Sequence, residues 1–473
     1  MPSATDSTND DARPSPALPR HSTALLIITS ISAFISPFNT SSINIALPLI
    51  GNEFNADAIT LSWVATSLLL TTAVFLIPLG RLADIHGMKK MLICGLTIYI
   101  FSALVGAVSG SIALLITSRV VQGVASAMIF STSTALLVLA YPLQQRGRVL
   151  GINIACVYTG LSLGPFLGGL LTQALGWRSI FWLISVLSLA PVVMTLSMIR
   201  GEWAEASGEK FDLPGSVIYG AGLIALMLGF AELPAWYGYA AVAASLLILA
   251  GFVMHELKVD SPVLNIRLFI DNRVFGMSNL AALVNYAATF AVTFLLSLYL
   301  QYNKGMTPGE AGLIILVMPL LQAIFSPLTG RLSDRFEARL LASGGMGLTM
   351  VGLLMLAFLS DNTQMPYIVA SLVVLGLGFA LFSPTNTNAI MSSVEIKALS
   401  IASATLATMR LIGQMLSMGI AMLVISVVIG HVQIIPTLYP QFMLCTQICF
   451  IIFSLLCCGG IFASLARGRA RNS

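Results

Sequence analysis

Charged residues are what this sequence has least of. Of its 473 residues only 9% are charged and 57% are hydrophobic, whereas a soluble domain carries about 25% charged residues. The net charge of +4 is too small to indicate nucleic-acid binding. Apolar runs of twenty or more residues recur from residue 23 to residue 465, so lipid is the solvent for most of the chain. The composition excludes a soluble fold and predicts one polytopic membrane domain.

Groups that other function classes require are also missing. The six cysteines lie inside apolar runs and lack metal-ligand spacing with histidine, which favours small buried side chains over a metal site. No nucleotide-binding signature is present, and no acid pair or Ser–His arrangement suggests an active site. His86, His255 and His431 are dispersed along loops or span ends. We therefore expect no catalytic residues, no metal and no cofactor, and a receptor or membrane enzyme is disfavoured.

The apolar runs predict fourteen membrane-spanning helices in an all-α polytopic protein. Residues 1–22 are rich in Ser, Pro, Asp and Asn, so we expect a disordered tail there, without a signal peptide. The spans lie near residues 23–50, 59–80, 91–111, 113–140, 148–175, 179–199, 214–233, 236–254, 275–301, 310–330, 339–360, 366–388, 399–429 and 440–464.

The distribution of basic residues gives the expected orientation. With fourteen spans and the N-terminus inside, 19 of the 23 Lys and Arg residues fall in cytoplasmic tails or loops, as the positive-inside rule requires. Only Arg178 and Lys304 fall outside, while Arg119 and Arg410 lie within spans. We therefore expect a multi-pass protein of the plasma membrane with both termini in the cytoplasm.

A glycine-rich charged loop occurs twice. Residues 80–90 read Gly-Arg-Leu-Ala-Asp-Ile-His-Gly-Met-Lys-Lys, and Gly-Arg-Leu-Ser-Asp-Arg recurs at 330–335, 250 residues later. The first copy resembles the signature loop between helices 2 and 3 of the major facilitator superfamily of secondary transporters, and the second resembles its weaker counterpart. A simple charged turn at the membrane edge is the alternative. The resemblance implies a cytoplasmic gate built from Gly80, Asp84, Gly87, Lys89, Lys90, Gly330, Asp334 and Arg335.

The repeat also predicts the domain organisation, because the family's transport core is two six-helix halves. Fourteen spans then require two extra helices between the halves. The longest hydrophilic stretch after the N-terminal tail is predicted to be a connector containing a lateral cytoplasmic helix. The expected parts are a tail at 1–22, an N-terminal half at 23–199, two inserted helices at 200–255, a connector at 256–273, a C-terminal half at 274–465 and a basic tail at 466–473.

Two further motifs resemble elements of this superfamily, and the one in span 5 resembles a motif of its antiporters, which include the fourteen-span drug:proton antiporter branch. Span 4 carries Arg119-x-x-Gln122-Gly, whose arginine the resemblance places facing the central cavity, with snorkelling to the membrane surface as the alternative. Span 5 carries Gly-Pro-x-x-Gly-Gly, for which a plain helix-packing seam is the alternative. The resemblance implies efflux of drugs or other small amphiphilic solutes in exchange for protons. The antiporter-motif residues are Gly160, Gly164, Pro165, Gly168 and Gly169.

Span 1 departs from the pattern of that branch. Residues 38–48 resemble its element Leu-Asp-x-Thr-x-x-Asn-x-Ala-Leu-Pro, but the aspartate is replaced by Asn39, which cannot titrate. Of the 19 acidic residues only Glu232 and Asp84 come near a span interior. A proton-independent facilitator or a metabolite transporter of the same fold therefore stands as the alternative.

Polar residues in spans of both halves predict a central cavity for a small-molecule substrate, although each alone could simply hydrogen-bond a neighbouring helix. Two buried arginines without an obvious acid lead us to expect that neutral or anionic solutes are accepted more readily than dications. The expected partners are this solute, the lipid bilayer and protons, with no nucleic acid or nucleotide. The predicted cavity residues are Asn39, Asn44, Arg119, Gln122, Tyr158, Asn285, Gln322, Asn386, Arg410 and Gln414.

Overall fold

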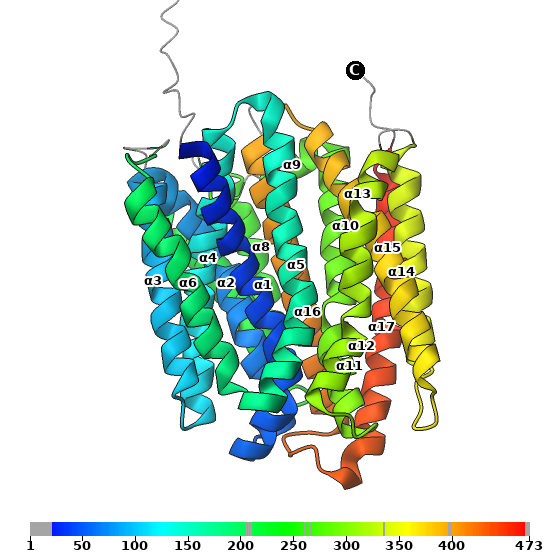
Figure 1. Ribbon diagram of the computed structural model, residues 1–473. Helices are drawn as coiled ribbons and strands as arrows, with labels where there is room; N and C mark the ends of the chain where they lie inside the picture. The colour runs from blue at the N-terminus through cyan, green and yellow to red at the C-terminus, as the bar shows by residue number, and fades with distance from the viewer. Residues whose placement is uncertain are drawn as a thin grey trace, which may run out of the picture.

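The fold is a bundle of long helices that run between two faces of the molecule (Figure 1). It is seen in a computed structural model that describes residues 21–204, 206, 208, 211–259, 262–264, 266–333, 336–395 and 399–468. Within these residues every regular element is helical. Fourteen helices are long and apolar enough to cross a membrane, which confirms the predicted all-α, fourteen-span architecture.

The first eight spans are single helices. Each ends close to where its apolar run ends, because a backbone in lipid must satisfy its own hydrogen bonds and so stays helical until it reaches water. These helices are α1 (His21–Phe54), α2 (Ala58–His86), α3 (Met88–Ala107), α4 (Ile112–Ala140), α5 (Leu143–Leu175), α6 (Arg178–Met198), α7 (Leu213–Glu232) and α8 (Trp236–Glu256).

Two later spans are each divided into two consecutive helices. The short α9, at Ile266–Asp271, lies where the sequence predicts a lateral helix in the connector. The remaining elements are α10 (Arg273–Thr289) and α11 (Ala291–Tyr302), which form one span, α12 (Pro308–Ile315) and α13 (Val317–Ser333), which form the next, and then α14 (Ala338–Ala357), α15 (Met365–Ser392), α16 (Leu399–Val428), η2 (Pro436–Leu438) and α17 (Tyr439–Ala466).

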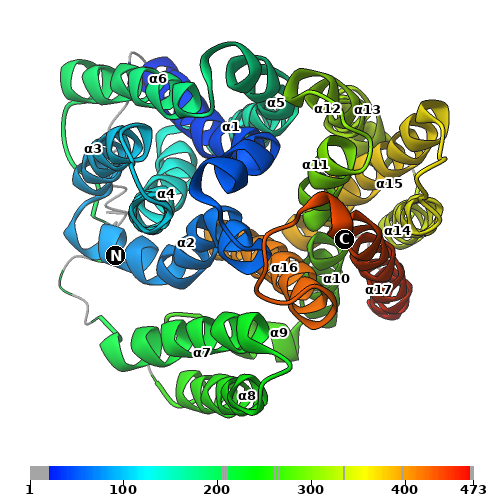
Figure 2. The same ribbon diagram turned by 90° about the horizontal axis from the view of Figure 1, so that it is seen from below.

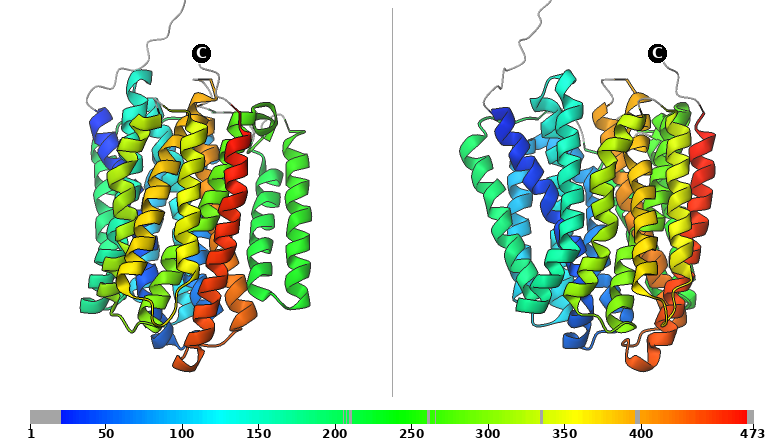
Figure 3. Two further views of the ribbon diagram at one scale, coloured as in Figure 1. Left: turned by 90° about the vertical axis from the view of Figure 1, so that its right-hand side faces the viewer. Right: turned by 45° about the vertical axis from the view of Figure 1, so that its right-hand side comes forward.

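The helices form two groups with α7 and α8 standing to one side. Viewed along the bundle, α1–α6 lie together and α10–α17 lie together (Figure 2), and the green α7–α8 pair forms one edge of the molecule (Figure 3). A small apolar cluster that includes Val74, Tyr219 and Met415 joins α7 to α2 and α16, and the Tyr219 hydroxyl donates to the Ala73 carbonyl at 3.0 Å. The inserted pair thus contacts both groups.

The turn between α1 and α2 is fixed by an N-cap. Oδ1 of Asp57 accepts hydrogen bonds from the backbone N–H groups of Ile59 and Thr60 at 3.0 and 2.9 Å, which satisfies donors that a helix N-terminus otherwise leaves unpaired. Burial alone would raise the pKa of Asp57, but the hydrogen bonds from Thr60 and Ile59 outweigh it and hold the pKa below its ordinary value. The charged carboxylate therefore stabilises the start of α2.

The start of the predicted basic tail at 466–473 is part of the packed structure. Arg467 is only 2% exposed and donates to Asn386 Oδ1 at 3.1 Å, to Ser278 Oγ at 3.3 Å and to the Ala338 carbonyl. Burial lowers the pKa of Arg467 to about 10. The guanidinium of this residue, at the start of the predicted basic tail, therefore ties the end of α17 to α10, α14 and α15.

Candidate functional site

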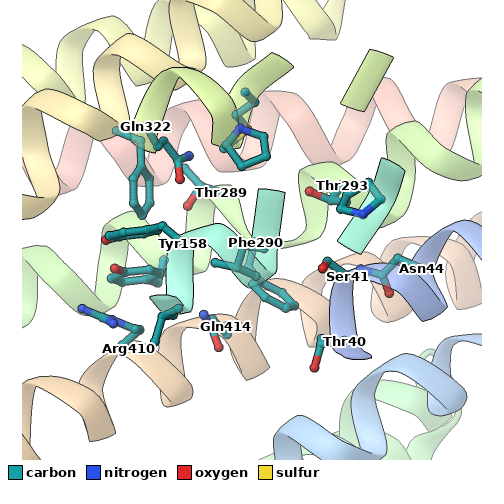
Figure 4. A pocket seen from close by; sticks show the side chains of 17 residues that line it. Thr40, Ser41, Asn44, Tyr158, Thr289, Phe290, Thr293, Gln322, Arg410 and Gln414 are labelled. Carbon is teal, nitrogen blue, oxygen red and sulfur yellow. The ribbon is translucent and has the colours of Figure 1, made fainter. Parts of the chain in front are cut away.

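A cavity lies between the two helix groups in the middle of the bundle. Its seventeen lining residues, all among the described part of the chain, come from α1 and α5 on one side and from α10, the α10–α11 junction, α11, α13, α15 and α16 on the other (Figure 4). Its volume is about 90 Å³, smaller than the 300–1,000 Å³ typical of ligand sites, so the helices must part to admit a solute. The polar or charged lining residues are Thr40, Ser41, Asn44, Tyr158, Tyr286, Thr289, Thr293, Gln322, Arg410 and Gln414.

Only half of the ten predicted cavity residues line this cavity. Asn44, Tyr158, Gln322, Arg410 and Gln414 do so, and they come from α1, α5, α13 and α16. The other five are buried elsewhere in this conformation, and for them the prediction of a shared cavity is wrong. These five are Asn39, Arg119, Gln122, Asn285 and Asn386.

Arg119 is enclosed inside the first helix group. Its exposure is 0%, and it donates from Nε to the Val64 carbonyl at 3.2 Å and from Nη1 to Gln122 Oε1 at 3.0 Å. Asn39 donates to the same Gln122 oxygen at 3.2 Å and to the Tyr99 hydroxyl at 2.8 Å. Buried polar groups need partners, and these residues supply them to one another only in part, because Asn39 Oδ1, Arg119 Nη2 and Gln122 Nε2 are buried without a hydrogen-bond partner. The expectation that Arg119 faces the central cavity is wrong in this conformation, and so is the alternative that it snorkels.

Two predicted asparagines of the second helix group also lie away from the cavity, one with hydrogen-bond partners and one without. Asn386 donates to the Ser278 carbonyl at 3.0 Å and accepts from Arg467. Asn285 is fully buried, and neither of its amide atoms has a hydrogen-bond partner. Because such a group costs free energy, Asn285 would gain from a partner in a second conformation of the bundle.

An aromatic layer crosses from one helix group to the other at the cavity. The rings of Tyr158 and Tyr286 both meet Phe379 edge to face, with centroids 6.4 and 5.3 Å away. The Tyr158 hydroxyl lies 2.6 Å from Ser383 Oγ, which joins α5 to α15. Tyr286, Phe379 and Ser383 were not predicted, because an aromatic or a serine in the middle of an apolar run usually serves only packing.

Among the described residues that line the cavity, Arg410 is the single charged one. Its guanidinium carbon lies 5.1 Å from the centroid of the Tyr286 ring, a cation–π distance. Its Nε is buried without a hydrogen-bond partner, and none of the ion pairs seen among the described residues includes it. The expected pair of cavity arginines is therefore reduced to one.

One end of the bundle lies away from the start of α1 and the end of α17 (Figure 1). We call this end the distal end. There the two groups meet through four backbone or side-chain hydrogen bonds. These run from Ser297 Oγ to the Asn44 carbonyl (2.9 Å), from Gln301 Nε2 to the Ile45 carbonyl (3.0 Å), from Gly309 N–H to Gln173 Oε1 (3.2 Å) and from Ala58 N–H to the Val432 carbonyl (3.0 Å).

The glycine motif of α5 has two separate faces. A side chain at Gly160 would begin 2.6 Å from the Phe34 carbonyl oxygen, and one at Gly168 would begin 2.6 Å from Ser42 Cβ, while Gly164 approaches Ser41 still more closely. These three glycines allow α1 and α5 to pack within one helix group, which is the packing-seam interpretation.

Gly169 instead faces the other helix group. A side chain there would begin 3.1 Å from the carbonyl carbon of Pro308 and closer still to its oxygen. Gly312 of α12 makes the reciprocal approach, since its side chain would begin 2.9 Å from the carbonyl carbon of Pro165. Here α5 therefore forms part of the distal closure, a distinction that spacing alone cannot make.

The predicted gate residues of the first copy lie where α2 meets α3: Gly80 and Asp84 in the last turns of α2, Gly87 between the helices, and Lys89 and Lys90 in the first turn of α3. Gly87 has a φ of 119°, which only glycine adopts without strain. Glu202, which was not predicted, accepts from the backbone N–H of Lys89 at 2.7 Å and of Lys90 at 3.3 Å, so an acid caps α3 where its dipole is positive. The Asp84 carbonyl accepts from Ala206 at 3.0 Å. The chain leaving α6 thus lies across this loop.

The second copy of the loop is less informative. A side chain at Gly330 would have only Pro384 Cβ within reach, at 4.0 Å, and Gly80 is tighter, with Ser131 Cβ at 3.2 Å. Asp334 and Arg335 lie outside the described residues. Gating by these residues stays a prediction.

One further buried acid was missed. Glu256, at the end of α8, is 3% exposed and accepts from the Leu264 N–H at 2.8 Å, while its Oε1 has no partner. Nearby, Asp212 lies 3.2 Å from His255 Nε2. The expectation that only Glu232 and Asp84 approach span interiors is therefore wrong. Two features of the sequence could have indicated this site: His255 and Glu256 are adjacent at the end of span 8, and Asp212 directly precedes span 7 as a possible N-cap.

Comparison with known proteins agrees with this architecture. The profile of the Major Facilitator Superfamily matches residues 29–279 and again 278–472. The chain is 30% identical to the multidrug resistance protein Stp of Mycobacterium tuberculosis, over 84% of this chain and 74% of that protein. It is 30% identical to the methylenomycin A resistance protein of Streptomyces coelicolor, over 80% of each, and 27% identical to the riboflavin transporter RibZ of Clostridioides difficile, over 82% and 84%.

Among solved structures, the human organic anion transporter MFSD10 superposes with a TM-score of 0.64 at 14% identity, over 94% of this chain and 99% of that one. This likeness shows the fold alone. With the profile covering most of the sequence in two consecutive matches, the chain is a transporter, not an enzyme, and it belongs to the major facilitator superfamily.

Proposed function

We propose that this protein exports small amphiphilic organic solutes across the plasma membrane by alternating access, with both termini in the cytoplasm. The observation that carries the proposal is the central cavity, which is lined from both helix groups and closed at the distal end. Relatives named for multidrug and methylenomycin resistance support export. The moving units would be the halves at 23–199 and 274–465, with 200–255 as the insertion.

In this scheme the present conformation is the one closed to the outside. A solute enters from the cytoplasm when the Tyr158–Ser383 contact opens. The halves then rock, the four distal hydrogen bonds break and the loop at 80–90 seals the cytoplasmic end. Each proton that moves inward across 100 mV supplies about 2.3 kcal/mol for this cycle.

Proton coupling is the part of the proposal that needs another site. Asn39 cannot carry a proton, and none of the described residues that line the cavity has a carboxylate. The second candidate function is therefore a proton-independent facilitator or metabolite transporter, which the relative named as a riboflavin transporter favours.

Transport by purified protein in liposomes separates the two functions. A panel of fluorescent amphiphiles is offered with and without an imposed pH gradient, and protein-free liposomes control for leakage. Export driven by protons predicts accumulation only with the gradient. An unchanged rate without it would refute proton coupling, and no transport of any compound would refute the whole proposal.

A further inference from the structure

We propose that the cavity selects planar aromatic monoanions, with Arg410 as the counterion of the bound solute. This inference rests on the proposed function and names the solute class for the same site.

The charge of Arg410 has no counterion among the described residues that line the cavity. None of the other sixteen described lining residues is ionised at neutral pH. The Arg410 guanidinium lies over the ring of Tyr286, and its buried Nε has no hydrogen-bond partner. A buried charge without a counterion is costly, and a cation–π contact offsets only part of that cost. An anionic group on the solute supplies what the protein lacks.

The second step is the aromatic layer beside this charge. Tyr158, Tyr286 and Phe379 meet edge to face, so ring faces and edges from both helix groups border the cavity. Flat aromatic solutes pack well against such surfaces. Tyr286 as a whole is 6% exposed, and its hydroxyl oxygen is buried without a hydrogen-bond partner, so this layer contains a polar atom that a solute could hydrogen-bond.

The third step is a second polar anchor away from the arginine. Figure 4 shows Asn44, Ser41 and Thr40 on the side of the cavity away from Arg410. Asn44 is 2% exposed, and its Oδ1 is buried without a partner. An amide oxygen accepts hydrogen bonds, so this end favours a donor on the solute. A solute with an acid group at one end of a flat ring system and a donor at the other satisfies both.

The same geometry disfavours cations. The described lining residues include no acid to pair with them, and a cationic group near Arg410 would add repulsion between like charges in a site of low dielectric. A charge-assisted hydrogen bond to Arg410 is worth about 10- to 150-fold in affinity. The solute's charge, more than its hydrophobicity, should therefore decide binding.

The test uses one ring system in three charge states. The probes are 7-methoxycoumarin-4-acetate, its neutral methyl ester and its cationic dimethylaminoethyl amide. Binding to the purified full-length protein in detergent is measured by equilibrium dialysis for wild type, Arg410→Gln and Arg410→Lys. Arg339→Gln removes the same charge from outside the cavity, where Arg339 lies beside Glu337, and serves as the control.

We expect wild type to bind the acid at least about 10-fold more tightly than the ester, and the cation most weakly. In Arg410→Gln the affinity for the acid falls to that for the ester, while the ester changes by less than about 3-fold. Arg410→Lys keeps part of the preference, and Arg339→Gln keeps all of it. The acid also raises the melting temperature of wild type but not of Arg410→Gln.

Two results would overturn the inference. One is equal binding of acid and ester by wild type, which decides the matter even if a variant folds poorly. The other is an acid preference that survives in Arg410→Gln. If wild type binds none of the three probes, the proposed solute class is wrong. Proton-driven transport of other amphiphiles in the liposome panel would then leave the proposed function standing.

Discussion

Replacing Gly169 by alanine should open the distal end of the transporter. The new methyl group would lie 3.1 Å from the Pro308 carbonyl carbon and 3.2 Å from Gly309 Cα, which is inside normal contact, and the obstacle is backbone that cannot rotate away. Overpacking of this kind costs about 1–3 kcal/mol. The cost applies only while α5 and α12 touch, so the equilibrium shifts by about 5- to 150-fold toward conformations in which they have separated.

The matched control is Gly151→Ala on the same helix. Nothing lies within 4 Å of a side chain at Gly151. Both variants gain about 1 kcal/mol of helix propensity in every conformation, so this gain does not change the balance between conformations. Any difference between the two variants therefore reports the contact with α12.

The assay measures access to the cavity from outside. Thr293, a lining residue, is changed to cysteine in a background without the six native cysteines, and cells are treated with a membrane-impermeant thiol reagent. We expect Gly169→Ala to increase the labelling rate by about 5- to 150-fold. The control variant Gly151→Ala should change the labelling rate by less than about 2-fold. Equal labelling in the two variants would refute closure of the cavity at the distal end.

Three further predictions concern single contacts. Tyr158→Phe and Ser383→Ala should each weaken the contact between Tyr158 and Ser383 by about 0.5–1.5 kcal/mol. The double variant should add little to either, and a double-mutant cycle that measures thiol labelling from the cytoplasmic side would show this. Gly87→Ala should destabilise the α2–α3 loop by about 1–3 kcal/mol, measured by thermal unfolding, because φ is 119° and Glu202 occupies the space. Asp57→Ala should cost about 0.5–2 kcal/mol. Because folding lowers the pKa of Asp57, the full cost should appear at a pH above the ordinary pKa of aspartate, and it should disappear as the pH falls through the lower pKa of the folded state. A cost that persists in acid would contradict the role of the charge.

The number of spans was predictable because lipid imposes it. Each span must be apolar over about 20 residues, so hydrophobic runs and the side on which basic residues collect encode the topology directly. The tight approach of Gly160, Gly164 and Gly168 to α1 was also within reach, since glycine at four-residue spacing indicates close helix contact.

The assignment of polar residues to the cavity was only half predictable. A polar side chain in an apolar run signals that it needs partners, but the sequence does not say which. Arg119 finds Val64 and Gln122 inside one helix group, whereas Arg410 remains exposed to the cavity without an ion-pair partner. The difference depends on how helices are rotated about their axes, and that is set by packing over the whole bundle. Asn386 shows the same limit, because its partner Arg467 lies 81 residues away.

A reversible cross-link across the distal end tests alternating access most directly. Gln173 and Gly309 already touch through a 3.2 Å hydrogen bond between the two helix groups. With both changed to cysteine in a background without native cysteines, oxidation should lock the distal end closed, stop solute transport in liposomes and allow transport to resume on reduction, while each single-cysteine variant is unaffected by oxidant. If fully cross-linked protein transported solute as fast as the same protein after reduction of the disulfide, alternating access through this end would be contradicted.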